Sequence, residues 1–179
     1  WDYEMPKQEK KDRKKTLEHL GLDPQKMHVL NVGLFHLNKN QKYIFDLAEE
    51  MSEENVQFHF IGNECYRGQC EINDLELPNC KIWGERADVD SFYSSMDLFL
   101  FPSHRELNPI CVKEALAWDM PVIMNKIESC DLYKRYEDNP DVEFICDINV
   151  KERVLDIAQK YNPLPKGEKD FTIALYTSF

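Results

Sequence analysis

The sequence contains little glycine and proline and no long apolar segment. Only 6 glycines and 9 prolines occur among 179 residues, whereas 42% of the residues are hydrophobic and 31% are charged. This composition excludes collagen-like, low-complexity and wholly disordered chains. The strongest apolar run, Leu98–Phe101 with its neighbours, is far shorter than the roughly 20 residues that a membrane-spanning helix needs.

Several catalytic signatures are missing as well. The chain has no GxSxG, no P-loop and no HExxH sequence, and the loop after the first expected strand lacks GxGxxG. The last absence disfavours a dinucleotide redox cofactor. None of the six cysteines, at positions 65, 70, 80, 111, 130 and 146, forms a CxxC pair.

The cysteines leave two interpretations open. Cys65, Cys70 and Cys80, with His59 nearby, form one candidate zinc site, although their spacing matches no common zinc pattern. The alternative is an ordinary loop with buried thiols. Because the N-terminal residues contain no apolar signal-peptide region, we expect free thiols in a reducing compartment, the cytoplasm or the cytoplasmic face of a membrane. The first residue is Trp1 rather than Met, which fits a piece of a longer chain.

Positive charge is also scarce. The 22 basic and 33 acidic side chains give a formal net charge of −11, which argues against nucleic-acid or anionic-membrane partners. Residues 1–15 are the exception, with six basic and four acidic side chains. An anionic ligand must therefore be held by a local positive site.

Short apolar runs alternate with amphipathic segments along the chain. The expected strands are His28–Gly33, Val56–Gly62, Cys80–Gly84, Asp97–Pro102, Pro121–Asn125 and Val142–Cys146. The expected helices are Glu9–Leu20, Lys39–Met51, Val89–Met96, Pro109–Trp118, Ser129–Tyr136 and Val150–Tyr161. This alternation predicts an α/β fold: a Rossmann-like, doubly wound parallel sheet of about six strands with helices on both faces.

The domain organisation follows from where this alternation ends. We expect residues 1–162 to form one ligand-binding domain. Residues 163–179 contain a Pro- and Gly-rich linker and then Phe171–Tyr176, which has the composition of a strand. This tail is either the start of a further domain or an edge strand or disordered tail.

Ligands of doubly wound sheets bind at the carboxyl ends of the strands. After the first strand, Gly33 permits close backbone approach, Asn38 is a candidate helix cap, and Lys39 at the first helical position would make an anion site. The alternative is a plain turn with an exposed lysine. Gly62 and Gly84 end two further strands, where they indicate either close ligand approach or tight turns.

The loop after the fourth strand holds the most functional groups. Asn108 and Pro109 are start signals for a helix whose free N–H groups would face a ligand, and Arg105 adds a fixed positive charge. Glu106 precedes this helix, and Glu114 lies within its apolar stretch, where ligand hydroxyls would satisfy a partly buried carboxylate. The alternative is a solvated strip of charge. Likewise, Glu85 after the third strand either faces the ligand or pairs with Arg86.

Taken in order, these segments resemble the C-terminal, donor-binding domain of GT-B glycosyltransferases, in particular the family 4 group of retaining enzymes. The resemblance covers about Leu17 to Tyr161. It rests on Leu20–Leu22, Val32–Gly33, Lys39–Gln41, Ile61–Asn63, Trp83–Gly84, Phe92–Ser103 and the E-x7-E pair Glu106 and Glu114 followed by Ala115–Val122.

The resemblance implies a metal-independent site, without a cofactor, for a nucleotide-diphosphate sugar such as a UDP- or GDP-sugar. Glu106 would contact the donor sugar and act in catalysis, Glu114 would hold the ribose hydroxyls, and Lys39 would bind the diphosphate. The first helical turn would add backbone N–H groups, and the third-strand loop would contact the base. The residues implied as donor-binding are Gly33, Lys39, Gly62, Gly84, Glu85, Arg105, Asn108, Ile110, Cys111 and Glu114.

The same resemblance implies a hexosyltransferase-like enzyme of glycan biosynthesis, with its acceptor on an N-terminal domain that is absent here. We therefore expect the isolated chain to bind donor weakly and to transfer nothing. Two alternatives are a non-catalytic nucleotide- or sugar-binding module and an epimerase-like GT-B enzyme acting on sugar nucleotides.

Two positions depart from the family pattern. Leu34 stands where the family usually has Arg or Lys after the first glycine, so Arg105 or Lys113 would have to supply that charge. Pro109 stands where the family usually has Gly, and it supplies no N–H group.

Overall fold

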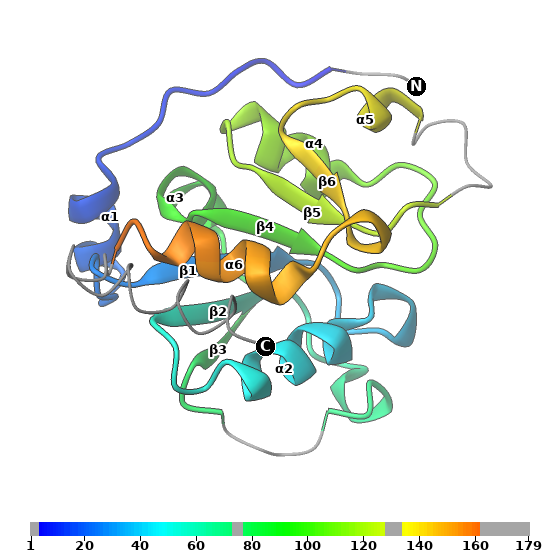
Figure 1. Cartoon of the computed structure of the whole chain (residues 1–179), viewed down its shortest axis with the longest axis horizontal. Coiled ribbons are helices and arrows are strands. Elements are labelled where there is room, and N and C mark those ends of the chain that lie inside the picture. The colour runs from blue at the N-terminus through cyan, green and yellow to red at the C-terminus, as the bar shows by residue number, and fades with distance from the viewer. Residues whose placement is uncertain (1–3, 73–76, 128–133, 162–179) are drawn as a thin grey trace, which may run out of the picture.

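The computed structural model describes residues 4–72, 77–127 and 134–161 (Figure 1). Six parallel strands form one sheet in the order β3-β2-β1-β4-β5-β6. The strands are β1 (Met27–Val32), β2 (Val56–Ile61), β3 (Cys80–Gly84), β4 (Leu98–Phe101), β5 (Val122–Met124) and β6 (Val142–Phe144). The predicted doubly wound sheet is confirmed. Its strand order reverses between β1 and β4, which is where such sheets bind ligands.

Helices cover both faces of the sheet. They are α1 (Arg13–His19), α2 (Gln41–Glu50), α3 (Val89–Ser95), α4 (Ile110–Ala117), α5 (Lys134–Glu137) and α6 (Val150–Ala158). Two apolar clusters show the layering. Side chains of α1, α3 and α4 share one cluster with the sheet, and side chains of α2 and α6 share the other. Of the described helices, none is long and apolar enough to span a bilayer.

Several predicted element boundaries are wrong by a few residues. Helix α1 begins at Arg13 rather than Glu9, because the Asp12 carboxylate accepts a hydrogen bond from Lys15 N at 3.0 Å and caps the helix there. Strand β6 ends at Phe144, and Ile145–Asp147 form a 3-10 turn instead. The expected strand Phe171–Tyr176 and residues 129–133 of one expected helix lie outside the described residues.

Helices α2 and α4 also begin at other residues than the sequence predicts. Lys39 ends a 3-10 turn, Leu37–Lys39, and Asn40 then adopts a left-handed conformation with φ 54° before α2 begins. The predicted cap at Asn38 is therefore wrong. Asn108 is not a cap either, since Pro109 occupies the N-cap position of α4.

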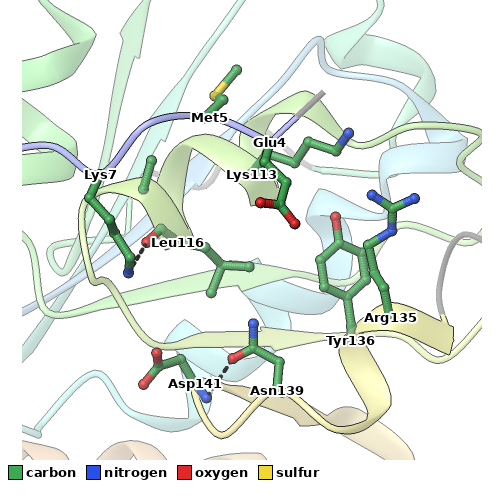
Figure 2. Close-up of a pocket in the computed structure, with 10 residues that line it drawn as sticks. Glu4, Met5, Lys7, Lys113, Leu116, Arg135, Tyr136, Asn139 and Asp141 are labelled. Carbon is green, nitrogen blue, oxygen red and sulfur yellow. Dashed lines mark hydrogen bonds between the residues drawn. The ribbon is translucent and has the colours of Figure 1, made fainter. Parts of the chain in front are cut away.

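The N-terminal segment runs along α4 (Figure 2). Gln8 N donates to Ala117 O at 2.8 Å, and Lys7 Nζ donates to Leu116 O at 3.1 Å. Between this segment, α4 and α5 lies a pocket of about 330 Å³, whose lining includes Lys113 and Arg135.

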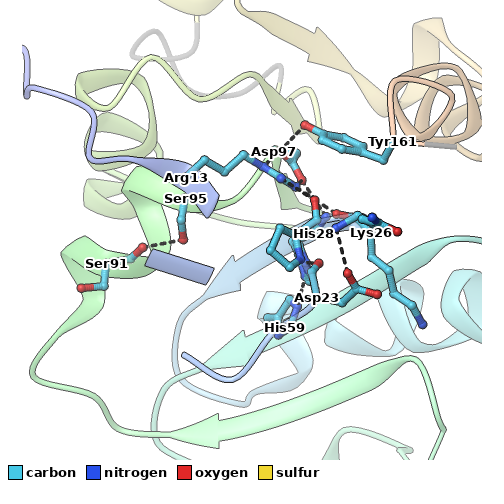
Figure 3. A network of polar contacts seen from close by, with 11 residues as sticks. Arg13, Asp23, Lys26, His28, His59, Ser91, Ser95, Asp97 and Tyr161 are labelled. Atoms are coloured by element: carbon cyan, nitrogen blue, oxygen red, sulfur yellow. Dashed lines mark hydrogen bonds and ion pairs between the residues drawn. The ribbon is translucent and has the colours of Figure 1, made fainter. Parts of the chain in front are cut away.

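A polar network lies at the amino-terminal edge of the sheet, where the strands begin (Figure 3). The Asp97 carboxylate accepts two hydrogen bonds from the Arg13 guanidinium and one from His28 N, each 2.8 Å long, and one from Tyr161 OH at 2.5 Å. Burial, and then Asp97, raise the pKa of Tyr161, so its phenol remains a donor at neutral pH. The network joins α1, β1, β4 and the segment after α6.

Candidate functional site

Three glycines stand at the carboxyl ends of β1, β2 and β3. Gly33 N donates to Ile61 O and Gly62 N donates to Gly84 O, each at 2.9 Å. Gly62 has φ 146°, and a Cβ built on it would lie 2.0 Å from Gly33 O. Neighbouring backbone therefore explains Gly62, whereas the space around Gly84, with φ 67°, is open.

The loops after β1 and β4 meet at the point where the strand order reverses. Asn38 O accepts a hydrogen bond from His104 N at 2.8 Å, and Ser103 Oγ lies 3.1 Å from the same oxygen. Asn38 Nδ2 donates to Arg105 O at 2.6 Å. These contacts join segments that lie more than 60 residues apart in the sequence.

The same contact zone brings Lys39 and Glu106 together. Lys39 Nζ forms an ion pair with Glu106 Oε1, and the two side chains are only 25% and 12% exposed. Ser103 Oγ lies 2.8 Å from the same Glu106 oxygen and is itself buried. Lys39 Nζ also lies 5.6 Å from the centre of the Phe101 ring. One cation and one carboxylate are thus held side by side at the mouth of the sheet.

Glu114 lies in the second half of α4, eight residues after Glu106, and is partly buried. Its Oε2 accepts a hydrogen bond from Tyr93 OH at 2.8 Å, so the alternative of a fully solvated strip is wrong. Burial raises the pKa of the Tyr93 hydroxyl well above its usual value, and Cys111 and Glu114 raise it further. Tyr93 is therefore a protonated donor that orients Glu114.

Cys111 lies in the first turn of the same helix. Burial raises the pKa of its thiol to about 12, which keeps it protonated at neutral pH. A protonated thiol is a poor nucleophile, so Cys111 offers a backbone N–H group rather than covalent chemistry. Ile110 N and Cys111 N belong to the first turn, where no preceding helical carbonyl accepts them.

The remaining predicted residues lie around this centre. Arg105, Asn108 and Ile110 are exposed on the β4 loop and at the start of α4, and Glu85 is exposed after β3. Arg86 does not pair with Glu85. It forms two 2.8 Å hydrogen bonds to Asp88 instead.

Large exposed apolar side chains gather at this edge of the described structure. They are Leu34 and Leu37 after β1, Tyr66 after β2, Leu107 after β4, and Ile110 at the start of α4. Such clustering is typical of a surface that another molecule or domain covers.

Sequence reasoning missed three contributors: Asn38 as a link between loops, Ser103 beside Glu106, and Tyr93 beside Glu114. Their signal is weak, because each is a common polar residue whose partner is set by the tertiary fold. For Ser103 a hint exists, since it comes two residues after the buried strand β4 and precedes Glu106 by three residues.

The residues of the zinc alternative have other partners. His59 Nε2 lies 2.9 Å from His28 Nδ1, and His59 Nδ1 accepts a hydrogen bond from Trp83 Nε1 at 3.1 Å. Burial raises the pKa of the Cys80 thiol to about 12. Within the described ranges, no three His, Cys, Asp or Glu side chains come together as metal ligands.

The chain belongs to the family of glycosyl transferases group 1, whose sequence model matches residues 12–139. The solved structures that it resembles are GT-B glycosyltransferases, so the expected class of protein is confirmed.

Individual relatives are distant. An uncharacterised 41.2 kDa protein in the cps region of Klebsiella pneumoniae is 24% identical over 124 residues, which are 68% of this chain and 34% of that protein. WaaG, a glycosyltransferase of lipopolysaccharide biosynthesis, has a TM-score of 0.59 and 21% identity over 83% of this chain and 41% of its own. A glycosyltransferase from Rickettsia africae has a TM-score of 0.64 and 15% identity over 83% of this chain and 44% of its own. The chain thus spans 34–44% of the length of these relatives.

Proposed function

We propose that this chain is the donor-binding half of a retaining glycosyltransferase that transfers a sugar from a nucleotide-diphosphate sugar to a glycan or another acceptor. The observation that carries the proposal is the Lys39–Glu106 ion pair at the reversal point of the sheet. A diphosphate needs a cation and a sugar needs hydrogen-bond acceptors, and this pair presents both groups at one place.

We assign the roles by charge. Lys39 and the N–H groups of Ile110 and Cys111 face the diphosphate, and they stabilise the negative charge that develops on it as the glycosidic bond breaks. Glu106 accepts hydrogen bonds from the donor sugar. Glu114, oriented by Tyr93, accepts them from the ribose hydroxyls. No step in this scheme needs a metal ion.

The base is assigned to the third-strand end at Gly84 and Glu85, where the backbone is open. Arg105 is a better substitute than Lys113 for the cation that Leu34 does not supply. Arg105 lies on the loop that holds Glu106, whereas Lys113 lines the pocket on the N-terminal segment (Figure 2).

The acceptor is assigned to a domain outside this chain. The exposed apolar side chains Leu34, Leu37 and Ile110 at the carboxyl edge support this assignment, because a further domain would cover them. We expect sugar transfer by the full-length protein on the cytoplasmic side of the cell and none by the isolated chain. Detectable transfer by the chain alone contradicts this part of the proposal.

A second candidate is a binding module without catalytic activity. The exposed apolar Leu34 and the missing N–H group of Pro109 favour it, because both remove interactions with a diphosphate. The Lys39–Glu106 pair opposes it. Activity of the full-length protein separates the two candidates.

Ligand-observed NMR with UDP, GDP, ADP and their sugar conjugates tests the donor site. UDP-sugars come first, because the structure of HepE from Anabaena, which has a TM-score of 0.51 and 21% identity to this chain, contains UDP-glucose. We expect binding of one nucleotide at about millimolar Kd. K39M should lower that affinity about tenfold. The control K42M should leave it unchanged, because Lys42 lies on α2 and pairs with Asp46 at the surface. Equal binding by K39M and the wild type contradicts the assignment.

Substitution of Glu106 and of Glu114 should change ligand affinity in different ways. E114Q should weaken binding of the nucleotide itself, because Glu114 is assigned to the ribose. E106Q should leave nucleotide affinity nearly intact and remove the additional affinity that the attached sugar confers. A comparison of UDP with UDP-sugar for both variants measures this difference, and identical profiles for the two variants contradict the division of roles.

A further inference from the structure

The Asn38 side chain caps neither the 3-10 turn in which it lies nor the helix α2 that follows. The N-cap of the 3-10 turn is His36, whose Nδ1 accepts a hydrogen bond from Asn38 N at 3.1 Å. The N-cap position of α2 is Asn40. Asn38 Nδ2 instead crosses to the β4 loop and donates to Arg105 O at 2.6 Å.

Two further contacts lead from the Asn38 main chain to the same loop. Asn38 O accepts a hydrogen bond from His104 N, and Ser103 Oγ lies 3.1 Å from the same carbonyl oxygen. Asn38 therefore contacts three consecutive residues of the β4 loop, and the next residue of that loop is Glu106. On its own side, the next residue is Lys39.

The start of the β4 loop is held separately. Asn125 Nδ2, after β5, donates to Pro102 O at 2.6 Å and lies 3.2 Å from Ser103 O. The loop is thus anchored to β5 at its start and to Asn38 just before Glu106. Without the Asn38 amide, the stretch from His104 to Asn108, which is exposed apart from Glu106, would lose the 2.6 Å hydrogen bond to Arg105 O and would keep the Lys39–Glu106 ion pair.

We propose that Asn38 is a positioning residue of the donor site, which sets Lys39 and Glu106 at the spacing that a diphosphate sugar needs. This inference rests on the proposed function and deepens it. Asn38 touches no reacting atom in this scheme. It acts through the backbone of the β4 loop, and its amide orientation is fixed because a carbonyl oxygen at 2.6 Å requires a donor.

The chemistry of position 38 makes the inference specific. Alanine removes the donor and leaves both main-chain contacts possible. Aspartate keeps the size but places a carboxylate oxygen against Arg105 O, which repels the loop. We therefore expect N38D to harm the site more than N38A.

The test measures binding of UDP, GDP and ADP, and of their nucleosides, to the 179-residue chain by NMR titration. N38A should weaken binding of the preferred diphosphate about tenfold and N38D more, with affinity for the matching nucleoside unchanged. A merely structural role would lower both affinities or lower the urea midpoint. The matched control is N55A, because Asn55 Nδ2 makes an equivalent 2.8 Å bond to Gln25 O at the amino-terminal edge. N55A should leave both affinities unchanged.

Three results overturn the inference. They are wild-type diphosphate affinity in N38A and N38D, equal weakening of diphosphate and nucleoside, and a larger fall of the urea midpoint in N38A than in N55A. If K39M loses diphosphate binding while N38A and N38D keep it, the inference alone fails. If the wild-type chain binds no nucleotide, the proposed function fails and the inference fails with it.

Discussion

Gly62 shows how a single residue shapes the carboxyl edge of the sheet. Its φ of 146° and the 2.0 Å separation of a built Cβ from Gly33 O mean that any side chain here displaces the end of β1. G62A should therefore lower the free energy of unfolding by more than about 3 kcal/mol. Urea denaturation followed by circular dichroism measures this change.

The control is Gly68, around which a built Cβ meets nothing within 4 Å. G68A should change the free energy of unfolding by less than about 1 kcal/mol. Similar losses in the two variants would contradict the explanation that the contact with Gly33 requires glycine at position 62.

At the scale of elements, strands β1, β2 and β3 share a buried chain of hydrogen bonds. Trp83 Nε1–H donates to His59, and His28 Nε2 lies 2.8 Å from Asp23 O. His28 therefore donates to Asp23 O, and the His59 Nε2–H group donates to His28 Nδ1. Each ring nitrogen is satisfied when both imidazoles are neutral, so an added proton would face another donor.

This arrangement predicts acid sensitivity. Burial lowers the pKa of His28, on which Asp97, Arg13 and Asp23 also act. Burial, then His28 and Lys81, lower the pKa of His59 well below its usual value. In the unfolded chain these imidazoles bind protons near pH 6.5, whereas in the folded chain they do not. Their contribution to the free energy of unfolding is therefore fully present above about pH 6.5 and is lost as the pH falls below it.

Urea midpoints between about pH 7 and about pH 5.5 check this expectation. Each imidazole changes the free energy of unfolding by at most about 1.4 kcal/mol per pH unit, and the urea midpoint follows that free energy. H59Q should roughly halve the slope, whereas H19Q, at an exposed position, should not change it. A midpoint that rises on acidification would contradict the mechanism.

Periodicity predicts the six strands because most are short apolar runs. Strands β1, β2, β4 and β5 are almost wholly buried, whereas the edge strand β3 is only partly buried. It misplaces their ends where an apolar residue such as Ile145 leaves the strand for a 3-10 turn. The roles of Asn38 and Asn108 were mistaken for a related reason. Asparagine caps helices and also bridges loops, and the partner that decides between these roles is a residue 67 positions away for Asn38.

The site follows the same rule. Doubly wound topology predicts that Lys39 and Glu106 share one edge of the sheet. It does not predict their direct ion pair, which depends on the register of β1 with β4 and on side-chain packing beside Ser103.

At the scale of the whole molecule, the Asp97 network connects the first helix to the last described residue (Figure 3). The Asp97 side chain is only 7% exposed and accepts hydrogen bonds from three residues. D97N places an amide N–H₂ group against donors, and should lower the free energy of unfolding by about 2–4 kcal/mol.

Thermal denaturation compares this variant with two others. Y161F removes one donor and should cost about 1 kcal/mol. D46N, which breaks the exposed Lys42–Asp46 pair, should cost less than about 0.5 kcal/mol. Equal losses for D97N and D46N would show that burial does not strengthen the network.

The link between the two loops has a consequence for how the protein can change over generations. Asn38 binds main-chain atoms at His104 and Arg105, so its contacts there do not depend on which side chains those positions carry. The main-chain course of the loop therefore does not depend on the side chains at these two exposed positions, although we assign the Arg105 guanidinium to the diphosphate. A library randomised at positions 104 and 105 would thus vary donor preference while the main chain of the β4 loop stays in place. A library randomised at position 38 would mostly contain variants in which that loop is displaced.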